Sequence, residues 1–141
     1  MEPVEVCLTT WSTDRPLLMH VRREVFVLEQ GVPEAEEWDD DDERSVHALA
    51  TLNREPVGTG RLTPDGRIGR LAVLPRHRGA GVGGRLLKLL VAEARRRGLL
   101  EAVLHAQLPV VPLYEKFGFR AEGEVFDEAG IPHRRMRLAL G

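Results

Sequence analysis

Residues 71–85 have the sequence LAVLPRHRGAGVGGR, in which an apolar run is followed by four glycines within six positions. The pattern predicts a strand that passes through a glycine-rich turn into a helix beginning near Val82. Glycines let a ligand approach the backbone closely, and the first turn of a helix presents unpaired N–H groups at the positive end of the helix dipole. Arg76 and Arg78 add positive charge. We therefore predict that this turn binds ligand phosphates.

Two common phosphate-binding folds do not fit this turn. Residues 79–84 satisfy the dinucleotide fingerprint G-x-G-x-x-G, but that fold begins with the strand before the turn. Here three strands are predicted before it, and Glu101, about 20 residues on, comes at the start of the next strand rather than at its end. A P-loop needs Lys and then Ser or Thr after its last glycine, whereas this chain has Arg85 and Leu86.

Outward from the turn, hydrophobic periodicity predicts alternating strands and helices. Strands are expected at residues 4–9, 46–52, 57–62, 68–74, 99–105, 119–126 and 134–140. Helices are expected at 82–97, at 111–117 and after a cap at Ser12 or Thr13, where the apolar face runs from Leu17 to Leu28. Hairpins and crossover units are mixed, so we predict a single α/β (α+β) domain spanning residues 1–141. Its six- to seven-stranded sheet should be mixed, mostly antiparallel and flanked by helices on both faces.

Composition excludes several classes of protein. The 141 residues are 43% hydrophobic and 30% charged, which is typical of a globular chain rather than a disordered one. No apolar run approaches the roughly 20 residues that span a bilayer, and the N-terminus lacks signal-peptide features, so we expect a cytoplasmic protein without membrane partners. Cys7 is the sole cysteine, and we expect a buried thiol there.

Charge is distributed unevenly along the chain. Residues 67–97 carry nine bases against the single acid Glu93, which suits an anionic ligand. None of the seven aromatic residues lies within that stretch to stack on bases, so we expect no nucleic-acid partner. Residues 34–43 carry eight acids and no base, and we expect a loop or irregular helix there. Elsewhere no histidines or acids show metal-ligand spacing, so no metal is expected.

In the glycine-rich turn the chain resembles the GCN5-related N-acetyltransferases (GNAT), whose acyl-CoA motif is matched by Arg78, Gly81 and Gly83. The resemblance extends through VVPLYEKFGF at residues 110–119, and Gln107 lies where many members have Asn.

Three further segments resemble the ElaA-like bacterial branch of this family: FVLEQ at residues 26–30, HAQ at 105–107 and EAGIPH at 128–133. Together with the turn, these segments cover most of the chain in the family's order.

The resemblance implies that acetyl-CoA is the co-substrate. Its pyrophosphate would bind the turn amides, and its pantetheine would pair with the exposed strand edge left where the strands around 68–74 and 99–105 splay apart. The cofactor-binding residues implied are Leu71, Ala72, Val73, Arg78, Gly79, Ala80, Gly81, Val82, Gly83, Gly84 and Gln107.

For catalysis, the resemblance implies that Tyr114 is the general acid that protonates the departing thiolate. The strand carrying the pantetheine offers no acid at residues 68–70, so Glu29 is our leading general base, followed by His105 and His133. Each of these residues has a structural alternative: Tyr114 packing on its helix, Glu29 at a solvated helix end, and the histidines as strand-end or turn contacts.

We therefore expect an acyl-CoA-dependent N-acetyltransferase in which the primary amine of a small molecule or peptide attacks the thioester directly. The alternative is a non-catalytic CoA-binding regulatory module. Unpaired sheet edges would allow a homodimer. In the resembling fold, the region of residues 34–43 commonly forms one wall of the acceptor cleft, so these acids would attract cationic amines, or they serve solubility alone.

Overall fold

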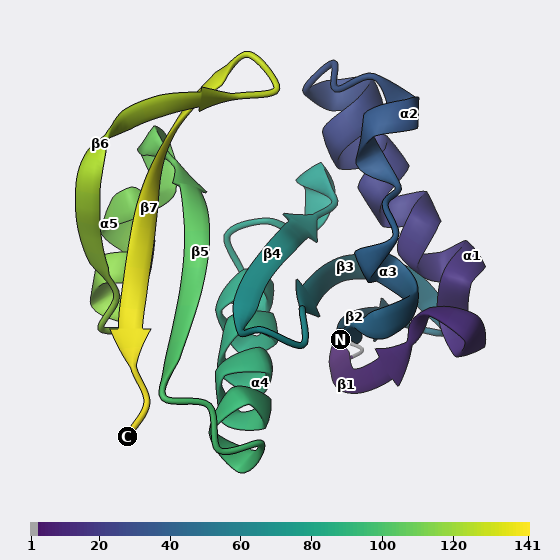
Figure 1. The fold of residues 1–141 in the computed structure, drawn as a ribbon. Coiled ribbons are helices and arrows are strands. Elements are labelled where there is room, and N and C mark those ends of the chain that lie inside the picture. The colour runs from purple at the N-terminus through teal and green to yellow at the C-terminus, as the bar shows by residue number, and fades with distance from the viewer. Residues whose placement is uncertain (1–2) are drawn as a thin grey trace.

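A computed structural model describes residues 3–141, in which seven strands form one sheet (Figure 1). The strands are β1 (Glu5–Thr10), β2 (Val46–Leu52), β3 (Glu55–Leu62), β4 (Arg67–Val73), β5 (Glu101–Gln107), β6 (Arg120–Glu128) and β7 (Ile131–Ala139). Their order is β1-β2-β3-β4-β5-β7-β6, and every neighbouring pair is antiparallel except β4 and β5, which are parallel. The predicted mixed, mostly antiparallel sheet is confirmed.

Helices cover both faces of this sheet. They are α1 (Trp11–Arg22), the π-helix η1 (Arg23–Glu29), α2 (Glu34–Glu37), α3 (Asp41–Arg44), α4 (Val82–Arg96) and α5 (Val111–Lys116), with short 3₁₀ turns η2 (Pro75–His77) and η3 (Leu108–Val110). Alternate side chains of a strand point to opposite faces. On β2, Ala48 and Ala50 therefore pack with α4, while Leu49 packs with Trp11 and Leu18 of α1. No helix within residues 3–141 is long and apolar enough to span a bilayer.

The first helix departs from prediction at both ends. Thr10, rather than Ser12 or Thr13, caps it by accepting a hydrogen bond from the Thr13 amide at 3.2 Å, because β1 runs directly into the helix. The helix then widens into the π-helix η1, whose longer repeat turns Leu28 away from the core, so Leu28 is 65% exposed.

Cys7 also departs from prediction, because it is exposed. It lies on β1, which is an edge strand of the sheet.

A β-bulge reshapes β4 beside the centre of the sheet. Thr59 pairs with Ala72 and Arg61 with Gly69, so Gly60 faces two residues of β4. One of them, Arg70, has a φ of +53°. A Cβ atom on Gly60 would lie 2.7 Å from Leu90 Cδ1, so glycine is required opposite the bulge.

Strands β4 and β5 separate almost as soon as they meet. Their pairing consists of Arg67 with Val103 and Ile68 with Leu104. Beyond these two pairs the strands diverge (Figure 1), which confirms the predicted splay and leaves the β4 edge from Gly69 onward unpaired with β5.

Candidate active site

A cleft of about 1150 Å³ occupies the divergence of β4 and β5. Its walls come from the glycine-rich turn and the start of α4, from α5, from η1 and from the β6–β7 turn. Tyr114, Glu29 and all the predicted cofactor-binding residues except Ala80 line it. The structure thus brings together residues that are far apart in the sequence.

The glycine-rich turn has the backbone geometry of an anion-binding turn. Gly79 and Gly81 have φ values of +82° and +80°, which side-chain-bearing residues rarely adopt. Gly81 precedes the first residue of α4. No side chain caps this helix, so its first N–H groups have no capping side chain as a partner. A Cβ atom on Gly79 or Gly81 would meet nothing within 4 Å. These residues fit a phosphate group approaching the backbone.

The remaining residues of the turn divide between binding and packing. Gly83 lines the cleft, and a Cβ atom there would lie 3.7 Å from Val73 Cγ2. A Cβ atom on Gly84 would lie 2.9 Å from Phe117 Cζ, so that glycine lets α4 and Phe117 pack together. The Val82 side chain is buried in the core, which leaves its backbone amide for any ligand.

Arg78 is held by two partners in this structure. Its Nη1 and Nη2 donate to the two carboxylate oxygens of Glu29 at 2.8 and 2.7 Å, and its Nε donates to the Val73 carbonyl oxygen at 2.8 Å. The hydrogen bonds from Arg78 lower the pKa of Glu29. A carboxylate with a lowered pKa is a weaker proton acceptor, so the contact with Arg78 disfavours Glu29 as general base, and its role stays a prediction.

The outer edge of β4 has no β5 partner beyond Ile68, although its Val73 carbonyl accepts the hydrogen bond from Arg78. The Leu74 amide donates to the Val57 carbonyl of β3, so the backbone of the preceding residue, Val73, points to the side from which β5 has diverged. At the far side of the cleft, Gln107 Nε2 donates to Gln30 Oε1 at 2.9 Å, which ties the end of β5 to the residue after η1.

Tyr114 projects from α5 into the cleft, with its ring edge-to-face against Phe119 at 6.2 Å between centroids. Within residues 3–141 its hydroxyl has no hydrogen-bond partner. Burial raises the pKa of Tyr114 to about 12, because the phenolate is poorly solvated there. The hydroxyl therefore carries its proton at neutral pH.

A polar cluster lines the opposite side of the cleft. His105 Nδ1 lies 2.9 Å from Glu128 Oε1 and 2.8 Å from Arg67 Nη2, and Arg67 Nη2 lies 3.3 Å from the same Glu128 oxygen. His133 Nδ1 donates to the Ile131 carbonyl at 2.6 Å, and its Nε2 lies 3.7 Å from Glu128 Oε2. This cluster joins β4, β5, β6 and β7 at the point where the sheet opens.

A family model described as Acetyltransferase (GNAT) domain matches residues 9–140. The chain belongs to the GNAT acetyltransferase family. It is 43% identical over 121 residues to the Uncharacterized N-acetyltransferase YjcF of Bacillus subtilis (strain 168). The match covers 83% of this chain and 86% of that protein. Membership makes a coenzyme A thioester its co-substrate.

Two solved structures share the fold of this GNAT chain. Escherichia coli ElaA superimposes with a TM-score of 0.86 at 29% identity, covering 95% of this chain and 99% of that one. An acyl-CoA N-acyltransferase from Pseudomonas aeruginosa superimposes with a TM-score of 0.86 at 28% identity, covering 97% and 100%. The predicted likeness to the ElaA-like branch is confirmed.

The acidic segment of this GNAT chain is a charge network rather than a bare negative wall. Buried Arg22 bonds to Glu37 at 2.9 Å and to Asp42 at 2.7 Å, and Arg61 bonds to Asp42 at 3.0 Å. Arg70, turned by the bulge, lies 3.0 Å from Glu37. The expected loop or irregular helix is the pair of short helices α2 and α3, which this network anchors to the sheet.

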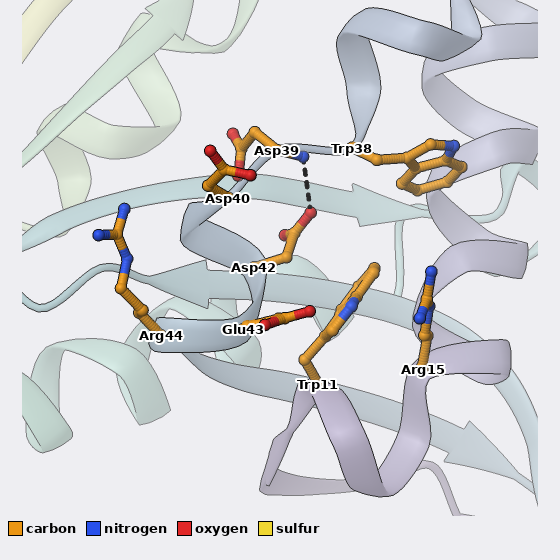
Figure 2. Close-up of a pocket in the computed structure, with 8 residues that line it drawn as sticks. All are labelled: Trp11, Arg15, Trp38, Asp39, Asp40, Asp42, Glu43 and Arg44. Carbon is orange, nitrogen blue, oxygen red and sulfur yellow. Dashed lines mark hydrogen bonds between the residues drawn. The ribbon is translucent and has the colours of Figure 1, made fainter.

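The residues around Asp42 also form a shallow hollow (Figure 2). The Asp42 carboxylate turns toward the Asp39 backbone amide, from which it accepts a hydrogen bond at 3.1 Å. Trp11 and Trp38 line the hollow, and their ring centroids lie 5.3 and 5.1 Å from the guanidinium carbon of Arg22. Both tryptophans therefore enclose the buried arginine of the network.

Sequence reasoning missed Arg67 and Glu128 as residues of this GNAT site. The signal for Glu128 was present, because it begins the segment EAGIPH at 128–133. Arg67 had no such signal, since its place at the cleft depends on the pairing of β4 with β5. Among residues 3–141, no three His, Cys, Asp or Glu side chains are grouped as metal ligands.

Proposed function

We propose that the chain transfers an acetyl group from acetyl-CoA to the primary amine of a small molecule or peptide by direct attack. The observation that carries this proposal is a single cleft with an uncapped, glycine-lined helix start at one end and the free, neutral hydroxyl of Tyr114 beside the strand divergence. The first feature suits binding of phosphates, and the second supplies a proton donor.

The proposed cofactor site uses backbone groups more than side chains. The amides of residues 79–84 would bind the pyrophosphate, and the free edge of Leu71, Ala72 and Val73 would pair with the pantetheine amides as an added strand does. The open space outside the turn and the unpaired edge of β4 support this assignment. Gln107, at the end of β5, would contact the same ligand from the opposite strand.

In the transfer step a C–N bond forms, the thioester C–S bond breaks, and the leaving sulfur needs a proton. A typical thiol has a pKa near 8.5 in water, but a cleft that raises the pKa of Tyr114 to about 12 also disfavours a free thiolate. Donation of the phenolic proton to sulfur therefore avoids a free thiolate and leaves a phenolate, to which water must return a proton.

Charge does not specify the acceptor as strongly as eight clustered acids suggest. Glu37, Asp39 and Asp42 are paired with arginines, so part of the negative charge of this wall is compensated. We therefore propose a primary amine as acceptor without a preference for cationic molecules.

The experiment is to incubate the protein with acetyl-CoA and a panel of primary amines while measuring thiol release and N-acetylated product by mass spectrometry. Amine-dependent thiol release that matches the amount of amide supports the proposal. Tight CoA binding in calorimetry with no amide from any amine would overturn it in favour of the non-catalytic regulatory module.

A further inference from the structure

We propose that His105, oriented by Glu128, accepts the proton of the acceptor amine. This inference rests on the proposed function and names a proton acceptor other than Glu29, which the contact with Arg78 disfavours. It is carried by the place of His105 in the divided sheet, by the partners of its ring and by the cleft that it shares with Tyr114.

His105 is the first residue of β5 beyond the pairing with β4, because the last pair joins Ile68 to Leu104. Leu104 and Ala106 are buried in the core beside α4, so His105 between them points to the opposite face of the sheet. Tyr114 packs on the α4 face. An acetyl group lying between the two strands would therefore have the proton donor on one face and His105 on the other.

The partners of His105 favour one tautomer. A proton on Nδ1 can be donated to Glu128 Oε1 at 2.9 Å, which leaves a lone pair on Nε2. The other neutral tautomer would accept from Arg67 at 2.8 Å, but it would place the bare Nδ1 against a carboxylate oxygen. Arg67 also lies 3.3 Å from that oxygen, where it compensates the carboxylate charge. The Nδ1–H tautomer brings its proton to within reach of the Arg67 Nη2 donor at 2.8 Å, but that donor has a second acceptor in Glu128 Oε1 at 3.3 Å, so we infer Nδ1–H and an unprotonated Nε2.

Glu128 remains ionised to perform this role. Burial raises its pKa, but the hydrogen bond from His105 and the charges of His105, Arg67 and His133 outweigh burial, so the net pKa is lowered. Arg135 lies opposite His105 on β7 and bonds to Glu122 at 3.0 Å. The charged and titratable groups facing His105 are thus Arg67, Glu128, His133 and Arg135.

The proton balance of the step is complete. The acceptor reacts as the free amine, after its ammonium form has lost one proton to solvent. As the amine nitrogen bonds to the acetyl carbon, a second proton passes to His105 Nε2, and the sulfur receives the Tyr114 proton as the C–S bond breaks. The resulting imidazolium is stabilised by the Glu128 carboxylate. After product release the imidazolium loses its proton to solvent, and water returns one to the tyrosine. The products are an amide and CoA thiol.

The first test requires no acceptor. Nitrogen-15 NMR of histidine-labelled protein at a pH above neutrality identifies the tautomer of each neutral ring. We expect His105 in the Nδ1–H form in the unmodified protein and in the Nε2–H form in Glu128→Leu, where Arg67 is the remaining partner. Glu124→Leu, which replaces an exposed acid on the same strand, should leave the tautomer unchanged. An Nε2–H tautomer in the unmodified protein would overturn the proposal.

The second test compares two acceptors of similar shape, benzylamine and O-benzylhydroxylamine. The nitrogen of the second is unprotonated at neutral pH and loses its proton to water readily once acylated. His105→Gln should lower kcat/KM for benzylamine by roughly 10²-fold, the usual scale for a lost general base, and for O-benzylhydroxylamine by less than about tenfold. His20→Gln, an exposed histidine on α1, should change neither.

Equal losses with the two acceptors would show that His105 has a structural role and would refute the assignment. If the unmodified protein binds CoA but acetylates neither these amines nor any other in the panel, the proposed function fails instead. The NMR measurement still reports on His105 in that case.

Discussion

Arg78 and Glu29 form a two-point ion pair across the cofactor end of the cleft, with N–O distances of 2.8 and 2.7 Å. The arginine comes from the turn before α4, and the carboxylate ends η1. An anionic ligand that needs the Arg78 guanidinium must therefore compete with Glu29. Binding of an anion to Arg78 in the glycine-rich turn would therefore release Glu29 at the end of the π-helix η1.

Glu29→Gln should strengthen CoA binding by about two- to fivefold, because exposed ion pairs of this kind contribute less than about 1 kcal/mol. Turnover should change little if His105, as we propose, and not Glu29 accepts the proton. Calorimetry with CoA and initial rates measure the two effects. Glu24→Gln, on the same π-helix, controls for the change in net charge. A fall of tenfold or more in kcat with unchanged affinity would restore Glu29 as the base.

Tyr114→Phe should lower kcat by roughly 10²-fold and leave CoA affinity within about twofold, because it removes a proton donor and little contact area. Stopped-flow or steady-state rates and calorimetry separate the two quantities. A rate loss below about threefold with a good acceptor would show that Tyr114 is only a packing residue and that solvent protonates the thiolate.

The raised pKa of Tyr114 also predicts a pH effect on stability. The unfolded chain loses the phenolic proton near pH 10 and the folded chain near pH 12, so the unfolded state binds fewer protons between these values. This contribution is intact below about pH 10 and is lost as the pH rises toward 12. In urea unfolding, the unmodified protein should therefore lose stability relative to Tyr114→Phe across that window. Parallel curves would contradict the burial of the hydroxyl.

Gly83→Val should weaken CoA binding by more than tenfold, about 1.4 kcal/mol, because the added atoms enter the cleft beside Val73. The backbone of Gly83 is helical, so the free energy of unfolding should change by less than about 1 kcal/mol. Gly84→Ala is the contrasting variant, since its Cβ would meet Phe117 and should cost stability as well. Unchanged affinity in folded Gly83→Val would remove the turn from the binding site.

Asp42→Asn should destabilise the fold by about 3 kcal/mol, because Glu37 and Asp39 are then the only partners of Arg22, Arg61 and Arg70 in the network, and one buried positive charge is in excess. Burial raises the pKa of Asp42, but the hydrogen bond and charge of Arg22 outweigh it and the net pKa is lowered. The stabilisation is therefore present above about pH 4 and is lost as the pH falls below it.

Urea unfolding at neutral and acid pH tests this prediction. Exposed Asp40→Asn should remain within about 0.5 kcal/mol of the unmodified protein. Equal stability of the two variants at neutral pH would mean that the acidic segment is solvated, as its composition alone suggests.

Local features of the chain were predictable because their causes are local. The glycines between residues 79 and 84 predict a turn with positive φ angles and a helix start. Strand and helix periodicities predict nearly all the remaining elements. The splay and the family followed from the resemblance carried by short motifs. Errors occurred where neighbouring structure overrides local preference, as at Leu28, which the π-helix turns outward, and at Cys7 on the sheet edge.

The strand and helix content, the glycine-rich turn and the place of Tyr114 on the helix that follows β5 could be predicted from the sequence alone. Which charged side chains meet depends on the tertiary structure. Glu29 and Arg78 are 49 residues apart, and His105 and Glu128 are 23 apart, yet each pair is in contact. The pKa and the hydrogen-bond partners of a carboxylate depend on the neighbours that folding brings within about 3 Å. The same side chain can therefore form an ion pair beside an arginine and orient a ring beside an imidazole.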